Sequence, residues 1–109
     1  MAPNALRRAV AHMEAHAGEP IRLRDMAQAA GTDSRTVQHA FARHFDASPM
    51  SYLRRFRLEQ AHRDLQRADP AAGDTVSAIA RRWGFANPGH FASSYCRRYG
   101  VLPGHTLRR

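Results

Sequence analysis

Residues 23–31 read LRDMAQAAG, and residues 76–84 read VSAIARRWG. In both stretches apolar residues recur at the i, i+3 and i+4 spacing of one helix face. Each stretch ends in glycine, the residue that most readily takes the left-handed conformation of a tight turn. The two stretches therefore predict two short helices, starting 53 residues apart, that each lead into a turn.

The likeness continues past the turns, where the spacing between matching residues becomes 54. A helix-capping side chain comes first, followed by an apolar stripe, an arginine and a proline. The pairs are Asp33 and Asn87, Val37 and Phe91, Phe41 and Tyr95, Arg43 and Arg97, Phe45 and Tyr99, Pro49 and Pro103, and Leu53 and Leu107. The chain thus contains two copies of one unit, which is a short helix, a tight turn and a second helix.

The remaining segments are also helical by pattern. A first helix carries an apolar face and ends near Gly18 and Pro20. Ser48 and Pro49 open a long helix of about 28 Å, and residues 69–74 have the composition of a loop. The expected inward residues are Leu6, Val10, Met13 and Ala17 in the first helix, and Leu53, Leu58, Ala61 and Leu65 in the long one.

These segments predict an all-α fold of seven helices. Two helix-turn-helix subdomains, residues 1–48 and 69–109, are expected to be joined by a connecting helix over residues 49–68. A single core typically serves a chain of this length, so the three parts are expected to form one domain.

The charge indicates an anionic partner. The chain has 109 residues, with 17 basic residues that are all Arg, against 9 acidic ones, for a net charge of +8. Arginine-only usage fits either the base composition of the genome or a function in anion binding. Charge alone does not choose between nucleic acid, an anionic membrane and an acidic protein.

Several classes are excluded by composition. The single Cys96 rules out an intramolecular disulfide framework and a cysteine zinc site. No apolar run approaches the roughly 18–20 residues of a membrane span, and the N-terminus lacks a signal-peptide core. The basic residues are spread over several helices, which disfavours a membrane-surface helix.

A helix-turn-helix suits the repeated unit. Ala27 and Ala80 allow close approach of the two helices, and the second helix can enter a major groove of duplex DNA with its N-terminal end. One copy alone fits equally a hairpin in a structural helix bundle. Two copies in a basic chain favour double-stranded DNA as the partner.

The chain resembles the DNA-binding domain of AraC/XylS-type transcription regulators over residues 5–108. The resemblance rests on LRDMAQAAG at 23–31, YLRRFRL at 52–58, IARRWGF at 79–85 and RRYGVLP at 97–103. It implies that the third and sixth helices read DNA, in adjacent major grooves about 34 Å apart, with the fourth as connector. Such domains activate or repress promoters, typically by contacting RNA polymerase as well as DNA.

On the first reader helix, Arg35, Gln38 and His39 match the family positions that enter the groove, and Thr36 also faces outward. Arg can clamp guanine O6 and N7, and Gln can pair with adenine N6 and N7. Arg43, near the helix C-terminus, is expected to contact phosphate or to favour the helix dipole. A solvated helix surface is the alternative for each.

The second reader helix offers only short contacts, from Gly89, His90 and Ser93. Many members of the resembled family carry a long polar residue where this chain has Ser93. We therefore expect the first copy to supply most base discrimination, and the second to anchor the DNA backbone and shape.

Other arginines are candidates for phosphate contact, although an ordinary solvated face explains any single one as well. By the resemblance, Arg57 is expected to hold a partner within the fold instead. The phosphate candidates, besides Arg43, are Arg54, Arg55, Arg81, Arg82 and Arg97.

No enzyme, cofactor or metal site is expected. His12 and His16 form an i, i+4 pair without an evident third ligand, and Cys96 has no base beside it. The chief alternative to sequence-specific DNA binding is a basic helical protein-interaction module.

The chain has no room for the effector-binding domain that such regulators often carry. Either a short stand-alone regulator or the C-terminal portion of a longer one fits. We expect a monomer in isolation, in the bacterial cytoplasm and associated with the nucleoid.

Overall fold

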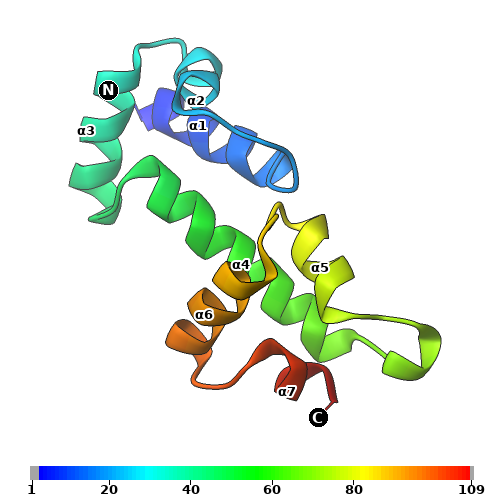
Figure 1. The fold of residues 1–109 in the computed structure, drawn as a ribbon. Coiled ribbons are helices and arrows are strands. Elements are labelled where there is room, and N and C mark those ends of the chain that lie inside the picture. The colour runs from blue at the N-terminus through cyan, green and yellow to red at the C-terminus, as the bar shows by residue number, and fades with distance from the viewer. Residues whose placement is uncertain (1–2, 109) are drawn as a thin grey trace. The chain divides into compact units, whose positions relative to one another are not determined.

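A computed structural model describes residues 3–108, which contain seven α-helices and no strand. The all-α prediction is confirmed (Figure 1). The helices are α1 (Pro3–Ala15), α2 (Leu23–Ala30), α3 (Ser34–Phe45), α4 (Pro49–Arg67), α5 (Val76–Arg82), α6 (Pro88–Tyr99) and α7 (Pro103–Arg108).

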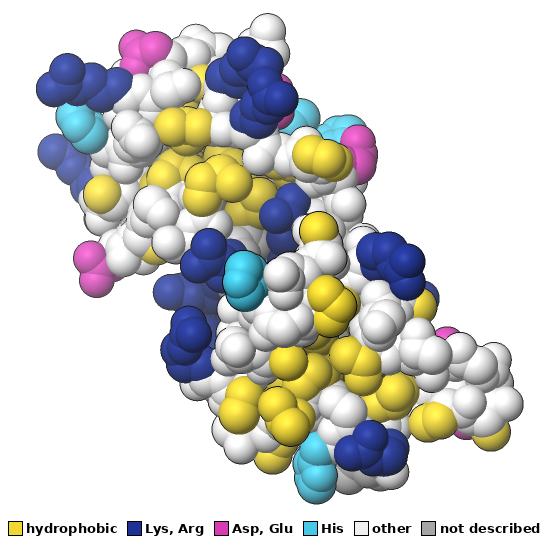
Figure 2. Space-filling view, in the orientation of Figure 1, with side chains coloured by type: hydrophobic (Ala, Val, Ile, Leu, Met, Phe, Trp, Pro, Cys, Tyr) yellow, Lys and Arg dark blue, Asp and Glu magenta, His cyan; other side chains and the backbone are white. Residues whose placement is uncertain are grey.

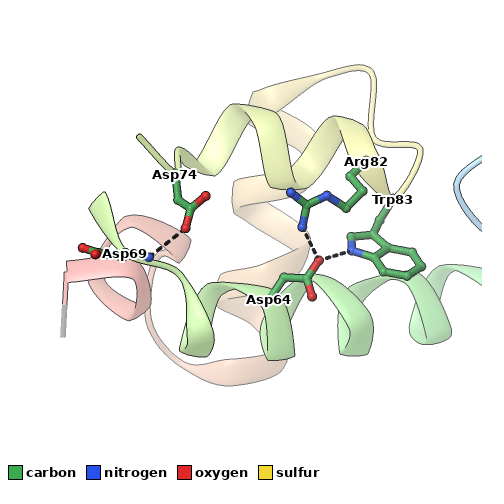
Figure 3. Close-up of polar contacts among 5 residues, drawn as sticks. All are labelled: Asp64, Asp69, Asp74, Arg82 and Trp83. Atoms are coloured by element: carbon green, nitrogen blue, oxygen red, sulfur yellow. Dashed lines mark hydrogen bonds and ion pairs between the residues drawn. The ribbon is translucent and has the colours of Figure 1, made fainter. Parts of the chain in front are cut away.

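The segment after α4 is more ordered than its composition indicates. It contains a short 3-10 helix, η1 (Pro70–Ala72), so the expectation of a plain loop is wrong. The Asp69 carboxylate accepts from the Ala71 amide at 2.9 Å. The Asp74 carboxylate accepts from the Asp69 amide at 2.8 Å (Figure 3). These side chains bind the segment's own backbone, which stabilises a turn that hydropathy does not detect.

The chain forms two compact units that divide within α4, one ending at Phe56 and the other beginning at Arg57. Each half of α4 therefore belongs to a different unit, and its buried residues serve two cores. The subdomain ranges expected from the sequence stay a prediction, and their terminal residues 1, 2 and 109 lie outside the described part.

In the first unit, α1 packs against α2 and α3. Met13 and Ala17 are buried, as predicted. Leu6 and Val10 are only half-buried, because the neighbouring Ala5 and Ala9 take the inward positions in the first half of α1. Alanines have the same i, i+4 spacing as the larger residues beside them. Their small side chains let neighbouring helices approach closely, which hydropathy alone underrates.

In the second unit, Leu58, Ala61 and Leu65 of α4 form a core with apolar residues of α5 and α6, as predicted. Tyr95 is fully buried in this core, and its hydroxyl donates to Thr106 Oγ1 at 2.8 Å. The same hydroxyl lies 2.7 Å from His62 Nδ1. These bonds connect α6 to both α4 and α7.

Asp64 ties α4 to the end of α5. One carboxylate oxygen accepts from Arg82 Nη1 at 2.7 Å and from the Trp83 indole Nε1 at 2.8 Å (Figure 3). The indole N–H of a partly buried tryptophan needs a partner, and the carboxylate supplies it. This contact helps to set where α5 ends and the following turn begins.

Candidate nucleic-acid interface

The two helix-turn-helix units close their turns with the same backbone geometry. Gly31 and Gly84 are left-handed, with φ of +74° and +85°. In each turn, the glycine amide and the next amide donate back to carbonyls of the preceding helix, in the pattern of a Schellman motif. The bonds are Gly31 to Gln28 and Thr32 to Ala27 at 3.1 and 3.0 Å, and Gly84 to Arg81 and Phe85 to Ala80, both at 3.0 Å.

The second helices also begin alike. The Asp33 carboxylate accepts from the Thr36 backbone amide at 2.8 Å at the start of α3, and the side-chain Oδ1 of Asn87 accepts from the His90 backbone amide at 2.9 Å at the start of α6. Hydrogen bonds from Thr36, first from its backbone and then from its side chain, hold the pKa of Asp33 below its ordinary value. Both helices have 12 residues, so the duplication is structural as well as sequential.

Their ends match too. Asp46 follows α3 with φ of +51°, and Gly100 follows α6 with φ of +78°; both amides donate back to the last turn of their helix. Asp46 is the one non-glycine residue with positive φ in residues 3–108. Pairing Asp46 with Gly100 at the 54-residue spacing would have predicted this conformation from the sequence.

On α3, the structure places the predicted contact residues on the solvent side. Arg35, Gln38, His39 and Arg43 are exposed and Thr36 is half-buried, while Val37, Ala40 and Phe41 face the core. A shallow hollow on this surface is lined by Thr36, His39, Ala40, Ala42, Arg43 and His44. His44, which the sequence did not single out, is therefore part of the same surface.

On α6, Gly89, His90, Ser93 and Arg97 are exposed, and Phe91 and Tyr95 are buried. The outer surface of α6 therefore corresponds to that of α3 but consists of shorter side chains. At the 54-residue spacing, Arg35, Gln38 and His39 of α3 correspond to Gly89, Ala92 and Ser93 of α6.

The phosphate candidates differ in their surroundings. Arg43, Arg54, Arg55, Arg81 and Arg97 are exposed. Arg82 is exposed as well but forms the ion pair with Asp64, and Arg98 pairs with Glu59 at 3.0 Å. On the face drawn in Figure 2, basic side chains appear in many places and acidic ones are few, which favours an anionic ligand.

Two arginines place their guanidinium groups close to the turns. The half-buried Arg57 places its guanidinium carbon 3.2 Å from the position that a Cβ on Gly84 would take, and burial lowers its pKa. Arg8 of α1 donates through Nη2 to the Ala30 carbonyl at 2.9 Å, next to Gly31. Sequence reasoning missed Arg8, because it lies outside the repeated segments.

Residues 3–108 contain no group of three or more metal-ligating side chains that could hold an ion. No described helix is both long and apolar enough to cross a membrane.

Comparison with known proteins gives consistent results. The family described as a helix-turn-helix domain matches residues 26–109. The probable thc operon regulatory protein of Rhodococcus erythropolis is 40% identical over 106 residues, which cover 97% of this chain and 32% of that protein. The chain thus spans about a third of the length of the curated relatives it matches.

Two solved structures are also similar. A probable AraC family transcriptional regulator from Rhodopseudomonas palustris superimposes with a TM-score of 0.85 at 39% identity, covering 97% of this chain and 96% of that chain. The DNA-binding domain of AdpA, a global transcriptional factor solved with a target DNA, has a TM-score of 0.84 at 26% identity, covering 95% and 90%.

Proposed function

The chain belongs to the AraC-type family of helix-turn-helix regulators, and from that premise we propose that it binds double-stranded DNA sequence-specifically and regulates transcription. In this proposal, α3 and α6 are the recognition helices and enter successive major grooves. The AdpA domain, which has the same fold, is a structure solved with its target DNA.

One observation carries the proposal: a tight turn followed by a capped helix occurs twice in the chain. The left-handed glycine and the capping oxygen occur at equivalent places before α3 and before α6. A helix-turn-helix uses this arrangement to aim the N-terminal part of its second helix at base edges. Its occurrence twice in a chain of net charge +8 fits two contacts with an extended polyanion.

The α3 surface has the chemistry for direct base reading. Arg35 and Gln38 can each form two parallel hydrogen bonds to one base, with guanine and adenine respectively. His39 and Thr36 lie beside them and can add single hydrogen bonds. The exposed Arg43 and Arg54 would neutralise phosphates, which adds affinity without sequence preference.

The α6 surface favours a different contribution. Gly89 and Ser93 present little side chain, and His90 reaches no farther than one ring. We propose that α6 contributes mainly through backbone and phosphate contacts, with Arg81 and Arg97 nearby in sequence. Arg82 is the weakest phosphate candidate, because Asp64 already neutralises it.

The wider setting follows from the family. The relatives are about three times as long as this chain, so we propose that a separate effector-binding or dimerisation domain acts with it in a longer protein. RNA polymerase is the proposed protein partner and the bacterial cytoplasm, at the nucleoid, the proposed location. The described domain is proposed to bind as a monomer to an asymmetric site.

The family is one of DNA-binding regulators and not an enzyme class. None of the similarities reported above favours the alternative of a protein-interaction module. That alternative predicts that duplex DNA of any sequence competes equally well in a gel-shift assay.

Selection of bound DNA from a random duplex library tests the proposal. We expect one enriched site with two segments about one helical turn apart, of which one segment is much more informative. Two equally informative segments would contradict the division of work between α3 and α6. No enrichment at all would contradict sequence-specific binding.

Arg35→Ala on the selected site identifies a base reader. We expect a loss of about 1–3 kcal/mol in binding free energy and relaxed preference at one base pair, because one bidentate contact disappears. Arg43→Ala, on the same helix, is the matched comparison and should weaken all sequences equally. A uniform loss for Arg35→Ala would make it a phosphate contact instead.

A further inference from the structure

The end of α2 depends on a side chain from another helix. The Gln28 and Ala27 carbonyls are satisfied by the backbone amides of Gly31 and Thr32. The Ala30 carbonyl is bound by the Arg8 guanidinium of α1 at 2.9 Å, and Ala30 is itself 1% exposed. In the folded chain the arginine therefore supplies a hydrogen bond to the last carbonyl of α2, which has no partner within the helix.

The bond lies at the point that sets the direction of α3. Gly31 follows Ala30 directly, and α3 begins at Ser34. A change in the orientation of the peptide between Ala30 and Gly31 would therefore be transmitted to the N-terminal turn of α3, where Arg35 and Gln38 lie.

The second unit shows a comparable arrangement. There the Arg57 guanidinium, from α4, lies against Gly84, the glycine that follows α5. Likewise, Nη2 of Arg8 lies 3.7 Å from the position that a Cβ on Gly31 would take. In each unit an arginine from the preceding supporting helix contacts the turn. These arginines are 49 residues apart, so the repeat spacing of 53 to 54 does not reveal the correspondence.

We propose that Arg8 is a positioning residue for DNA recognition, which orients α3 by holding the Ala30–Gly31 peptide and does not contact DNA. This inference rests on the proposed function, because it assigns α3 to base reading. Arg8 is itself exposed as a residue, but its Nη2 donates to the Ala30 carbonyl, whereas the exposed arginines Arg43 and Arg54 are candidates for phosphate contact.

Arg8→Met tests this proposal, with Arg7→Met as the matched control. Both variants remove one positive charge from neighbouring, exposed positions of α1, and only Arg8 has a bond to the Ala30 carbonyl. We expect Arg8→Met to weaken binding to the selected DNA about 5- to 30-fold more than Arg7→Met does, since a buried carbonyl loses its charged donor. The slope of log K against log salt should be the same for both variants.

Amide hydrogen exchange without DNA gives an independent measurement. The Gly31 and Thr32 amides should exchange faster in Arg8→Met than in the wild type, and at the wild-type rate in Arg7→Met. A slope smaller by about 0.9 for Arg8→Met, with unchanged exchange, would instead assign Arg8 to a phosphate and overturn the proposal. Equal affinities of the two variants would also overturn it.

Two further outcomes can be separated. If Arg8→Met does not fold, Arg8→Lys retains the charge but not the planar guanidinium, and should show the same direction of change in exchange at Thr32. If the wild-type chain binds no DNA, the proposed function fails. Faster exchange at Gly31 and Thr32 in Arg8→Met would then still establish that Arg8 orders the turn.

Discussion

The side chains of Asp33 and Asn87 cap their helices in the same way, but only the Asp33 carboxylate can ionise. Each accepts a hydrogen bond from the amide three residues later. The aspartate adds a negative charge at the N-terminus of α3, where the helix dipole favours it. The first recognition helix is therefore capped in a pH-dependent manner and the second is not.

Asp33→Asn should remove this pH dependence. The pKa of Asp33 in the folded chain lies below its ordinary value of 3.8. The charged cap therefore contributes its full stability above pH 3.8, and this contribution is lost as the pH falls through the lower folded value. We expect the melting temperature of the wild type to drop more steeply below about pH 4 than that of Asp33→Asn.

Circular dichroism melting curves from pH 6 to pH 2.5 provide the measurement. Asn87→Asp is the reciprocal variant and should add an acid-sensitive contribution at α6. Parallel pH profiles for wild type and Asp33→Asn would show that the cap charge contributes nothing measurable.

At the scale of elements, each recognition helix depends on the turn before it. Gly84 combines a left-handed φ with close packing of Arg57. Gly73 has a similar φ of +95° but no atom within 4 Å of its Cβ position. At Gly73 a side chain would be opposed only by the left-handed φ. At Gly84 it would be opposed by the left-handed φ and by contact with Arg57.

Gly84→Ala should destabilise the chain more than Gly73→Ala. A left-handed alanine costs about 1–2 kcal/mol at either position. At Gly84 the new methyl group also displaces Arg57, and we expect about 1 kcal/mol beyond the cost at Gly73. Urea denaturation followed by Trp83 fluorescence measures the difference. Equal losses would mean that Arg57 moves aside freely.

The link between α4 and α5 offers a second prediction. Asp64→Ala removes the acceptor of the Trp83 indole and leaves a partly buried donor without a partner, so we expect a loss of about 1–3 kcal/mol in unfolding free energy. Arg82→Ala removes only an ion pair whose arginine side chain is 54% exposed, and should cost at most about 0.5 kcal/mol. Thermal unfolding compares the two, and an equal or larger loss for Arg82→Ala would contradict this ranking.

At the scale of the whole molecule, the excess of positive charge is spread over both units. Exposed arginines lie on α3, α4, α5 and α6, so phosphate contacts are available from each unit. Sequence-independent affinity is therefore expected to dominate the total binding energy, with base contacts adding selectivity.

Binding to the selected DNA should depend strongly on salt. If six to ten phosphates are engaged, affinity should fall about 10³- to 10⁵-fold between 50 and 200 mM salt. Fluorescence anisotropy across this range measures the slope. Arg54→Ala should reduce the slope by about 0.9, and a nearly salt-independent dissociation constant would contradict the phosphate contacts.

The helices and their order could be predicted from local chemistry. Glycine and proline, with capping residues such as Asp33 and Asn87, act within a few residues of where they stand. The periodicity of buried residues in α4 and α6 requires no knowledge of partners. The repeated pattern added what one copy could not, because matching caps and turns at one spacing identified a duplicated helix-turn-helix.

The candidate readers could be chosen in the same way. Once Val37 and Phe41 define the inner face of α3, Arg35, Gln38 and His39 must lie on the outer one. The sequence did not show which of several similar side chains takes a given position or partner. Alanines and larger residues both fit the inner stripe of α1, and exposed and ion-paired arginines look alike in one dimension.

The sequence by itself therefore determined the all-α fold, the duplicated unit and the outer faces of its second helices, since these depend on neighbours a few residues apart. Only the tertiary structure decided that Arg82 is held by Asp64, that Arg57 lies against Gly84 and that Arg8 binds the end of α2. Those contacts join residues that are 18 or more positions apart in the chain. Long side chains with equal charge reach different partners only after the helices have packed.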